Sequence, residues 1–243
     1  MSAGRGELGR GFVLHTRPWR NTSMLVEAFT AEAGRIGLVA RGVRQRSSRN
    51  RALLEPFQPL LLGWSGRGEL RNLHTVEAER WRAPPTGRTL LAAFYCSELV
   101  MRLLGRDDPN AEAFAAYGAV IERLTAGEVA EAALRCFELE LLDALGFAPP
   151  LDVVPDTGER VEAGRDYEFL AEHGPSPAYG PAGSAALRVP GSHLLAIAGR
   201  EFDDADVRRS ARRILRASLA PHLGNRPLKS RELYRSMYSG SAT

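Results

Sequence analysis

The sequence contains little cysteine and almost no lysine. Its 243 residues include two cysteines, Cys96 and Cys136, and a single lysine, Lys229. Two thiols cannot supply a four-cysteine zinc site, and no cofactor or metal ion is expected. Each cysteine lies among apolar residues in a stretch with helical periodicity, where a free thiol packs as a small hydrophobic side chain. We therefore expect both cysteines in the core.

Long apolar runs and catalytic motifs are also missing. No stretch approaches 18 consecutive apolar residues, so no transmembrane helix is expected, and without a signal peptide we expect a cytoplasmic protein. The patterns GxxxxGK[ST], HExxH and GxSxG are absent. The five histidines are scattered, without a partner at the spacing of metal ligands. These absences favour a protein that is not an enzyme.

Positive charge is distributed unevenly, although the formal net charge is only +3. Residues 1–82 contain 14 arginines and 7 acidic residues, a net charge of +7. Residues 83–192 contain 8 basic and 17 acidic residues, and residues 193–243 contain 10 and 5, which gives −9 and +5. Two basic segments flanking an acidic one indicate a negatively charged partner such as nucleic acid.

The first 82 residues contain five short runs typical of β-strands, separated by turn residues. Five strands with a long connection after the third favour a small OB-fold barrel, although the spacing also fits an SH3-like barrel. The turns include Pro18, Ala33 with Gly34, and a hairpin at Ser65–Gly68. The runs are "GFVLHT" (11–16), "SMLVEAFT" (23–30), "GRIGLVARGV" (34–43), "QPLLLGW" (58–64) and "ELRNLHTVEAE" (69–79).

From residue 86 onward the apolar period becomes helical. Asp108 followed by Pro109 is typical of a helix start. Residues 148–192 contain seven prolines and predict turns and short strands, after which "SHLLAIAG" and "DADVRRSARRILRASLAPHL" return to helix. The sequence thus predicts an α+β protein: a barrel domain over 1–82, and an α-helical domain over 83–243 that carries the irregular insert.

The connection after the third strand, "ARGVRQRSSRNRALLEPF" (40–57), has five arginines between positions 41 and 51 and no acidic residue there. It lacks an alternating apolar pattern, and Ser47, Ser48 and Asn50 predict a mobile, solvated loop. Such a loop can follow a phosphate backbone, releasing condensed counterions. The alternative is a charged loop that contributes only solubility. Trp19 and Trp64 could stack on bases, or could pack in the barrel.

A second basic cluster lies in the predicted helix 204–223, where arginines cover the side opposite an apolar stripe of Val207, Ile214, Leu215 and Leu219. These arginines either bind phosphates or only cover the core with their stems. A further helix start at Ser230 offers amide groups that can bind an anion. The candidate DNA-contacting residues are Arg17, Arg20, Arg35, Arg41, Arg44, Arg46, Arg49, Arg51, Arg208, Arg212, Lys229 and Arg231.

Four stretches in order, "GFVLHTRPWRNTSMLVEAFTAEAGRIGLVARGVR", "LLEPFQPLLLGWSGRGELRNLHTVEAE", "LRCFELELLDALGFAP" and "LGNRPLKSRELYR", resemble the bacterial RecO family of recombination mediators. The resemblance implies an N-terminal OB-fold, a helical C-terminal domain, binding of single- and double-stranded DNA, strand annealing and no catalytic turnover. It also implies RecR and the acidic C-terminal tail of single-stranded DNA-binding protein (SSB) as partners. The implied outcome is loading of RecA onto SSB-coated DNA at the nucleoid.

By the same resemblance, Arg135 in "LRCFELELL" matches the position from which the family offers an arginine to the SSB tail. Leu134 and Phe137 would receive the apolar side chains of the tail. The alternative is an intrahelical ion pair of Arg135 with Glu131 or Glu138. Some members of the family hold zinc with four cysteines in the insert, whereas residues 148–192 here contain none.

Two other function classes stay open from the residues alone. An OB-fold can serve an RNA-binding factor, which would recognise the 2′-hydroxyl group. The acidic run "FDDADV" (202–207) would suit a metal-dependent nuclease that uses Asp203 and Asp204. The alternative for these acids is a helix N-terminus, where carboxylates cap free amides.

Overall fold

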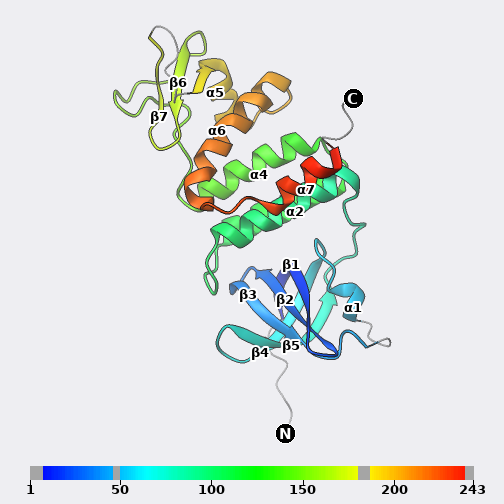
Figure 1. Ribbon diagram of the computed structural model, residues 1–243. Helices are drawn as coiled ribbons and strands as arrows, with labels where there is room; N and C mark the ends of the chain where they lie inside the picture. The colour runs from blue at the N-terminus through cyan, green and yellow to red at the C-terminus, as the bar shows by residue number, and fades with distance from the viewer. Residues whose placement is uncertain (1–7, 46–49, 180–186, 239–243) are drawn as a thin grey trace. The chain divides into compact units, whose positions relative to one another are not determined.

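The computed structural model describes residues 8–45, 50–179 and 187–238, and the chain divides into two compact units (Figure 1). The first unit contains Met1–Gly127 and Pro227–Thr243, and the second contains Glu128–Arg226. The chain therefore leaves the first unit and returns to it for its last helix. The boundary predicted at residue 82 marks the change from strands to helices. The first compact unit extends beyond it, because helices after residue 82 pack in the same unit as the barrel.

Five strands form a closed barrel in the order β1-β2-β3-β5-β4 (Figure 1). All neighbouring pairs are antiparallel except β3 and β5, which are parallel. The five strands and the hairpin between β4 and β5 are confirmed, and the fold is the expected OB-fold barrel followed by a helical region. The strands are β1 (Gly9–Trp19), β2 (Ser23–Thr30), β3 (Gly34–Ala40), β4 (Pro59–Ser65) and β5 (Leu70–Ala78).

The strands alternate apolar residues into the barrel core. Val13, Ile36, Leu38 and Leu60 are almost fully buried there. Pro18 was expected to end the first strand, but β1 continues through it to Trp19. Strand β4 pairs with β1 only between Gly9 and Phe12, so the missing amide hydrogen of Pro18 interrupts no ladder on that side.

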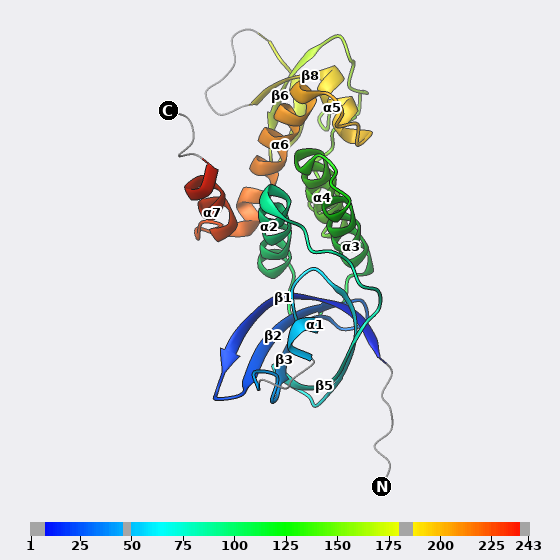
Figure 2. The same cartoon turned by 90° about the vertical axis from the view of Figure 1, so that its right-hand side faces the viewer.

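Aromatic rings join the barrel to the helices of the first unit. The ring centroid of Phe12 lies 5.6 Å from that of Phe114 and 5.3 Å from that of Tyr117. The Tyr117 hydroxyl lies 2.8 Å from the Ser97 hydroxyl, and burial raises the pKa of this phenol. Helix α7 lies beside α2 (Figure 2). The helices are α1 (Asn50–Leu53), α2 (Gly87–Leu103), α3 (Ala111–Thr125) and α7 (Lys229–Tyr238).

Helix α3 begins later than predicted. Asn110, not Asp108, is the N-cap, and its side chain accepts a hydrogen bond of 2.8 Å from the Ala113 amide. The preceding residues are held by the barrel instead, because the Asp107 amide donates to the Arg35 carbonyl at 2.9 Å. The carboxylate of Asp107 also pairs with Arg71 of β5. These contacts fix the α2–α3 connection to the barrel.

The second unit combines three helices with the predicted insert. The insert forms a three-stranded sheet in the order β7-β6-β8, which confirms short strands between the helices. Helix α6 packs against α4 and α5, and Val207, Ile214, Leu215 and Leu219 are buried as the stripe predicts. The elements are α4 (Ala130–Ala144), β6 (Asp166–Leu170), β7 (Gly174–Pro177), β8 (Leu187–Pro190), α5 (Gly191–Ala198) and α6 (Ala205–Leu223).

Both cysteines are buried, as expected, and carry free thiols. Within the described residues, no helix is long and apolar enough to cross a lipid bilayer, and no group of three or more histidine, cysteine or acidic side chains has a metal-binding arrangement. The acidic run at 202–207 begins a helix instead. The Asp204 carboxylate caps α6 by accepting from the amides of Asp206 and Val207 at 2.6 and 3.2 Å.

Candidate nucleic-acid interface

The arginine segment starts on a fixed support, the turn between β1 and β2. The Arg44 amide donates to the Thr22 carbonyl at 2.9 Å. The Arg44 guanidinium also donates to the carbonyls of Arg20 and Asn21, at 3.1 and 3.4 Å. Residues 41–44 are therefore held at the end of β3, beside the β1–β2 turn.

Three exposed arginines surround this point. Strand pairing places Pro18 opposite Met24 and Met24 opposite Ala40, so Arg17, Arg20 and Arg41 lie around neighbouring strand ends. All three side chains are exposed, and none forms an ion pair with a described residue. Uncompensated guanidinium groups on an exposed surface are available to phosphates.

Trp19 lies in the same place. Its exposed fraction is 37%, and the Arg20 guanidinium carbon lies 6.0 Å from its ring centroid. Trp64, in contrast, is half-buried and packs against the barrel core. The packing alternative therefore describes Trp64, whereas Trp19 keeps an accessible ring beside cations.

The remainder of the arginine segment is described from Asn50 onward. Arg46 and Arg49 lie outside the described residues. Asn50–Leu53 form the short helix α1, on which Arg51 is exposed. Leu54 and Phe57 are 2% and 3% exposed and anchor the segment to the interior. The expected loop is thus wrong for these residues, because apolar side chains tie them to the fold.

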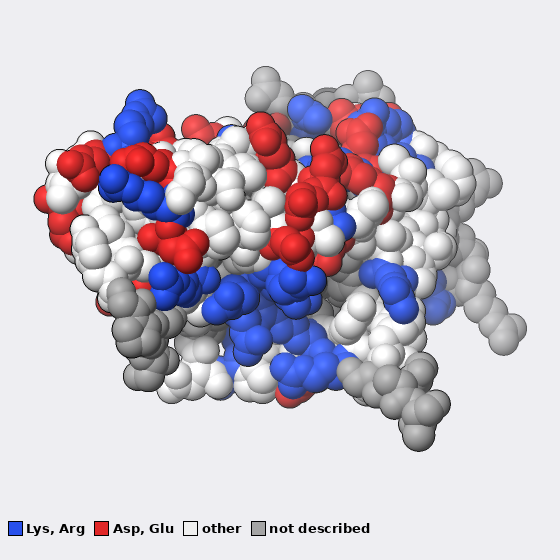
Figure 3. Space-filling view, turned by 90° about the horizontal axis from the view of Figure 1, so that it is seen from above, with Lys and Arg blue, Asp and Glu red and all other residues white. Residues whose placement is uncertain are grey.

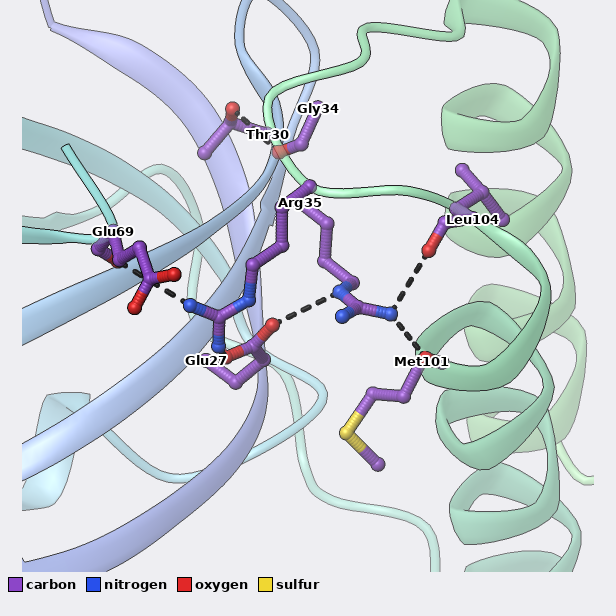
Figure 4. A network of polar contacts seen from close by, with 8 residues as sticks. Glu27, Thr30, Gly34, Arg35, Glu69, Met101 and Leu104 are labelled. Atoms are coloured by element: carbon purple, nitrogen blue, oxygen red, sulfur yellow. Dashed lines mark hydrogen bonds and ion pairs between the residues drawn. The ribbon is translucent and has the colours of Figure 1, made fainter.

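Arg35, predicted as a DNA contact, has its guanidinium engaged within the protein. Its guanidinium donates to the carbonyls of Met101 and Leu104 at the end of α2, the second at 2.9 Å (Figure 4). Its Nε lies 2.9 Å from the Glu27 carboxylate, and both side chains are 15% exposed. Arg106 approaches the same carboxylate at 2.5 Å. These contacts join strands β2 and β3 to α2.

Replacing Arg35 with alanine should therefore lower stability and leave DNA affinity unchanged. We expect a loss of about 2 kcal/mol in the free energy of unfolding, since hydrogen bonds to a charged group contribute about 1.5 to 3 kcal/mol. Urea unfolding and a DNA titration of the folded variant measure the two quantities. Weaker DNA binding with unchanged stability would return Arg35 to the interface.

The arginines of α6 differ in their availability. Arg208 donates to the carbonyls of Phe202 and Asp203, both at 2.6 Å, so its guanidinium is occupied at the start of the helix. Arg212 lies 3.6 Å from Glu131 across an exposed surface. Arg213 and Arg216 are exposed and form no ion pair with a described residue. Figure 3 shows basic side chains gathered on the viewed face beside acidic ones.

The amides at the start of α7 do bind an anion, but it belongs to the same chain. Glu98 of α2 accepts from the amides of Lys229 and Ser230, both at 2.9 Å, and from the Ser230 hydroxyl at 2.7 Å. Burial raises the pKa of Glu98, but these hydrogen bonds and the Arg102 charge outweigh burial and lower it overall. Arg231 donates to the Tyr95 hydroxyl at 3.1 Å. The amides of Lys229 and Ser230 at the start of α7 are therefore not available to a phosphate.

Arg135 forms an ion pair within its own helix, which is the alternative considered from the sequence. Its side chain is 7% exposed and pairs with Glu138, 2% exposed, at 2.9 Å within α4. Phe137 is fully buried, and Leu134 is half-buried. Both side chains lie in the interior of the second unit, and binding of a peptide tail by Arg135 and Phe137 stays a prediction.

Comparison with known proteins places these features in a family. The family models described as Recombination protein O N terminal and Recombination protein O C terminal match residues 7–81 and 84–232. The chain belongs to the recombination protein O family. The N-terminal family model covers the barrel and the arginine segment, and the C-terminal family model covers Arg135 and Glu138.

Curated relatives align with nearly the whole length of this chain. The chain is 44% identical over 229 residues to the DNA repair protein RecO of Methylococcus capsulatus, which covers 94% of this chain and 93% of the relative. It is 46% identical over 239 residues to the DNA repair protein RecO of Alkalilimnicola ehrlichii, covering 98% and 94%. The Salmonella newport protein of the same name is 42% identical over 228 residues, covering 93% of each chain.

Sequence reasoning missed the two carboxylates that organise the first unit, Glu27 and Glu98. Neither belongs to a motif, and each lies inside a regular strand or helix pattern. The only signal is that each places an acid among apolar neighbours on a side that should be buried, where a charge needs a partner.

Proposed function

We propose that this protein is a non-enzymatic DNA-repair and recombination mediator that binds and anneals DNA. With RecR it would promote loading of RecA onto single strands coated with SSB, whose acidic tail would bind the helical region. The observation that carries the DNA-binding part is the group of exposed arginines Arg17, Arg20 and Arg41 beside the exposed Trp19, none of which forms an ion pair with a described residue. Family membership supports the repair role.

The contact to DNA would use the phosphate backbone first. Arg17, Arg20, Arg41 and Arg51 present guanidinium groups along the start and end of the arginine segment. Each neutralised phosphate releases counterions, so affinity falls as salt rises. Such contacts do not read sequence, as suits a protein that acts on any damaged strand. The exposed Arg213 and Arg216 of α6 would extend binding to the second unit.

Reversing Arg17, Arg20 and Arg41 to glutamate should weaken binding of a single-stranded oligomer by about 10- to 100-fold at low salt. If the three side chains each contact one phosphate, the slope of log affinity against log salt should shrink by about 2. Fluorescence anisotropy at several salt concentrations measures both quantities. A parallel competition with an RNA oligomer of the same sequence tests preference through the 2′-hydroxyl group.

The matched control reverses Arg160, Arg165 and Arg188, exposed arginines of the second unit, and changes the net charge equally. We expect this variant to keep most of its affinity. Equal losses in the two triple variants would mean that only total charge matters and would remove the barrel surface from the mechanism. The SSB part is tested separately, by adding the protein to SSB-coated strands and to the tail peptide alone.

A further inference from the structure

Trp81 is a large aromatic side chain that the fold does not use. It follows β5, and 78% of its surface is exposed. Among the described residues from 71 to 93 it is the only large apolar side chain that is exposed. Its neighbours in the chain are Arg80 and Arg82. Leaving an indole in water forfeits the burial that normally makes tryptophan stabilising, which points to a use outside the core.

The backbone on both sides of Trp81 is held firmly. The Gln58 side chain donates to the Arg82 carbonyl at 2.6 Å and accepts from the Arg82 amide at 3.1 Å. The Glu79 amide donates to the Pro59 carbonyl at 3.0 Å. The indole is therefore presented from a fixed support, so little backbone entropy would be lost when a ligand covers it.

The two arginines beside Trp81 have different roles. Arg82 has only 13% of its side chain exposed and pairs with Glu122 of α3 at 2.8 Å, which anchors the segment. Arg80 is 59% exposed and lies 3.5 Å from the same carboxylate. A long, exposed pair of this kind contributes little and can be exchanged for a phosphate. Trp81 thus lies between Arg82, which is fixed by its ion pair, and Arg80, whose exposed guanidinium is available to a phosphate.

The arginine segment leads directly to this place. The connection between β3 and β4 that contains this segment begins at Arg41, beside Trp19, and ends at Gln58, which binds Arg82. The connection between β3 and β4 therefore has an exposed tryptophan next to each of its ends. A strand bound at Arg41 and at Arg80 would find an aromatic ring beside each of these arginines.

We propose that Trp81 stacks on an unpaired base of single-stranded DNA, with Arg80 contacting an adjacent phosphate. This inference rests on the proposed function and names a contact that the arginine segment alone does not supply. A base needs only one open ring face, which Trp81 offers. A protein partner would use a wider apolar patch, whereas Trp81 has arginine on both sides of it in the chain.

The experiment compares two ligands that differ only in their bases: an oligothymidine and an abasic strand of the same length. Trp81→Ala should weaken oligothymidine binding by about 5- to 150-fold, the range found for one stacked base. Its affinity for the abasic strand should stay within about 2-fold of that of the unmodified protein, because phosphate contacts are kept. Trp81→Phe should retain most of the affinity, since a smaller ring still stacks.

Tyr179→Ala is the matched control, because Tyr179 is an aromatic residue of the second unit with 87% exposure. It should change neither affinity. Oligothymidine should also quench the tryptophan fluorescence of the unmodified protein more than that of Trp81→Phe. Circular dichroism verifies that each variant is folded.

Two results would overturn the inference while leaving the proposed function intact: unchanged oligothymidine affinity in Trp81→Ala, or equal losses for both ligands. Absence of binding to either ligand by the unmodified protein at low salt would instead contradict the proposed function itself.

Discussion

Replacing Arg135 with alanine is expected to lower the free energy of unfolding of the second unit by about 3 to 5 kcal/mol, the usual result of removing one partner of a buried ion pair. The guanidinium faces the Glu138 carboxylate at 2.9 Å, and both side chains are nearly excluded from water. Among the described residues, the Nε of Arg135 has no hydrogen-bond acceptor, so Glu138 is its main compensation. Urea unfolding and hydrogen exchange of α4 and α6 measure the loss.

Two further variants separate this buried pair from a surface effect. Arg212→Ala breaks an exposed pair in the same unit, with side chains 60% and 43% exposed, and should cost at most about 1 kcal/mol. Replacing Arg135 with methionine and Glu138 with leucine together should restore stability, because apolar residues of similar volume often equal a buried ion pair. A stable Arg135→Ala protein that fails to bind the SSB tail peptide would show a direct role for Arg135 in that contact.

Replacing Glu98 with alanine should release α7 from α2 and cost about 3 kcal/mol. The carboxylate accepts three hydrogen bonds from the first turn of α7, and bonds to a charged group contribute about 1.5 to 3 kcal/mol each without being additive. Trypsin should then cleave faster after Arg231 and Arg235, which lie on α7. Ser230→Ala removes only the hydroxyl contact and should cost about 1 kcal/mol.

The same contact predicts a pH dependence with a definite sign. The folded state lowers the pKa of Glu98. Its contribution is therefore fully present above the unfolded carboxyl pKa of about 4.3 and is lost as the pH falls through the lower folded pKa. Acidification through this range should accelerate cleavage of α7 in the unmodified protein by an acid protease such as pepsin, which replaces trypsin in this measurement. Glu98→Gln, which cannot titrate, should lack the part of this acceleration that Glu98 causes, and identical pH profiles would contradict the assignment.

The sequence predicted the barrel well, because its strands follow a two-residue apolar alternation separated by turn residues, and each long amphipathic helix followed its own stripe. The first residue of a helix was predicted less accurately than the strands. Asp108 and Pro109 satisfy local capping rules, yet the barrel holds the neighbouring Asp107 through the Arg35 carbonyl, and α3 starts after Asn110. A tertiary contact overrode the local preference there.

Individual arginines were the hardest to assign. Arg17 and Arg35 both lie in strands, and no local pattern says that one is exposed while the other caps the end of α2. The difference comes from the position of Met101 and Leu104, more than 60 residues away in the chain. Arg135 and Glu138 likewise have the spacing of an ordinary surface pair, and only packing of the second unit reveals their burial.

The return of the chain to the first unit affects how the protein can be made. Residues 128–226 are inserted between α3 and the segment that bears α7. During synthesis the barrel, α2 and α3 leave the ribosome first. Glu98 can accept its hydrogen bonds from Lys229 and Ser230 only after these residues have been synthesised. The first unit therefore completes its native contacts only after the whole second unit has been translated, so folding of the two units is coupled in time.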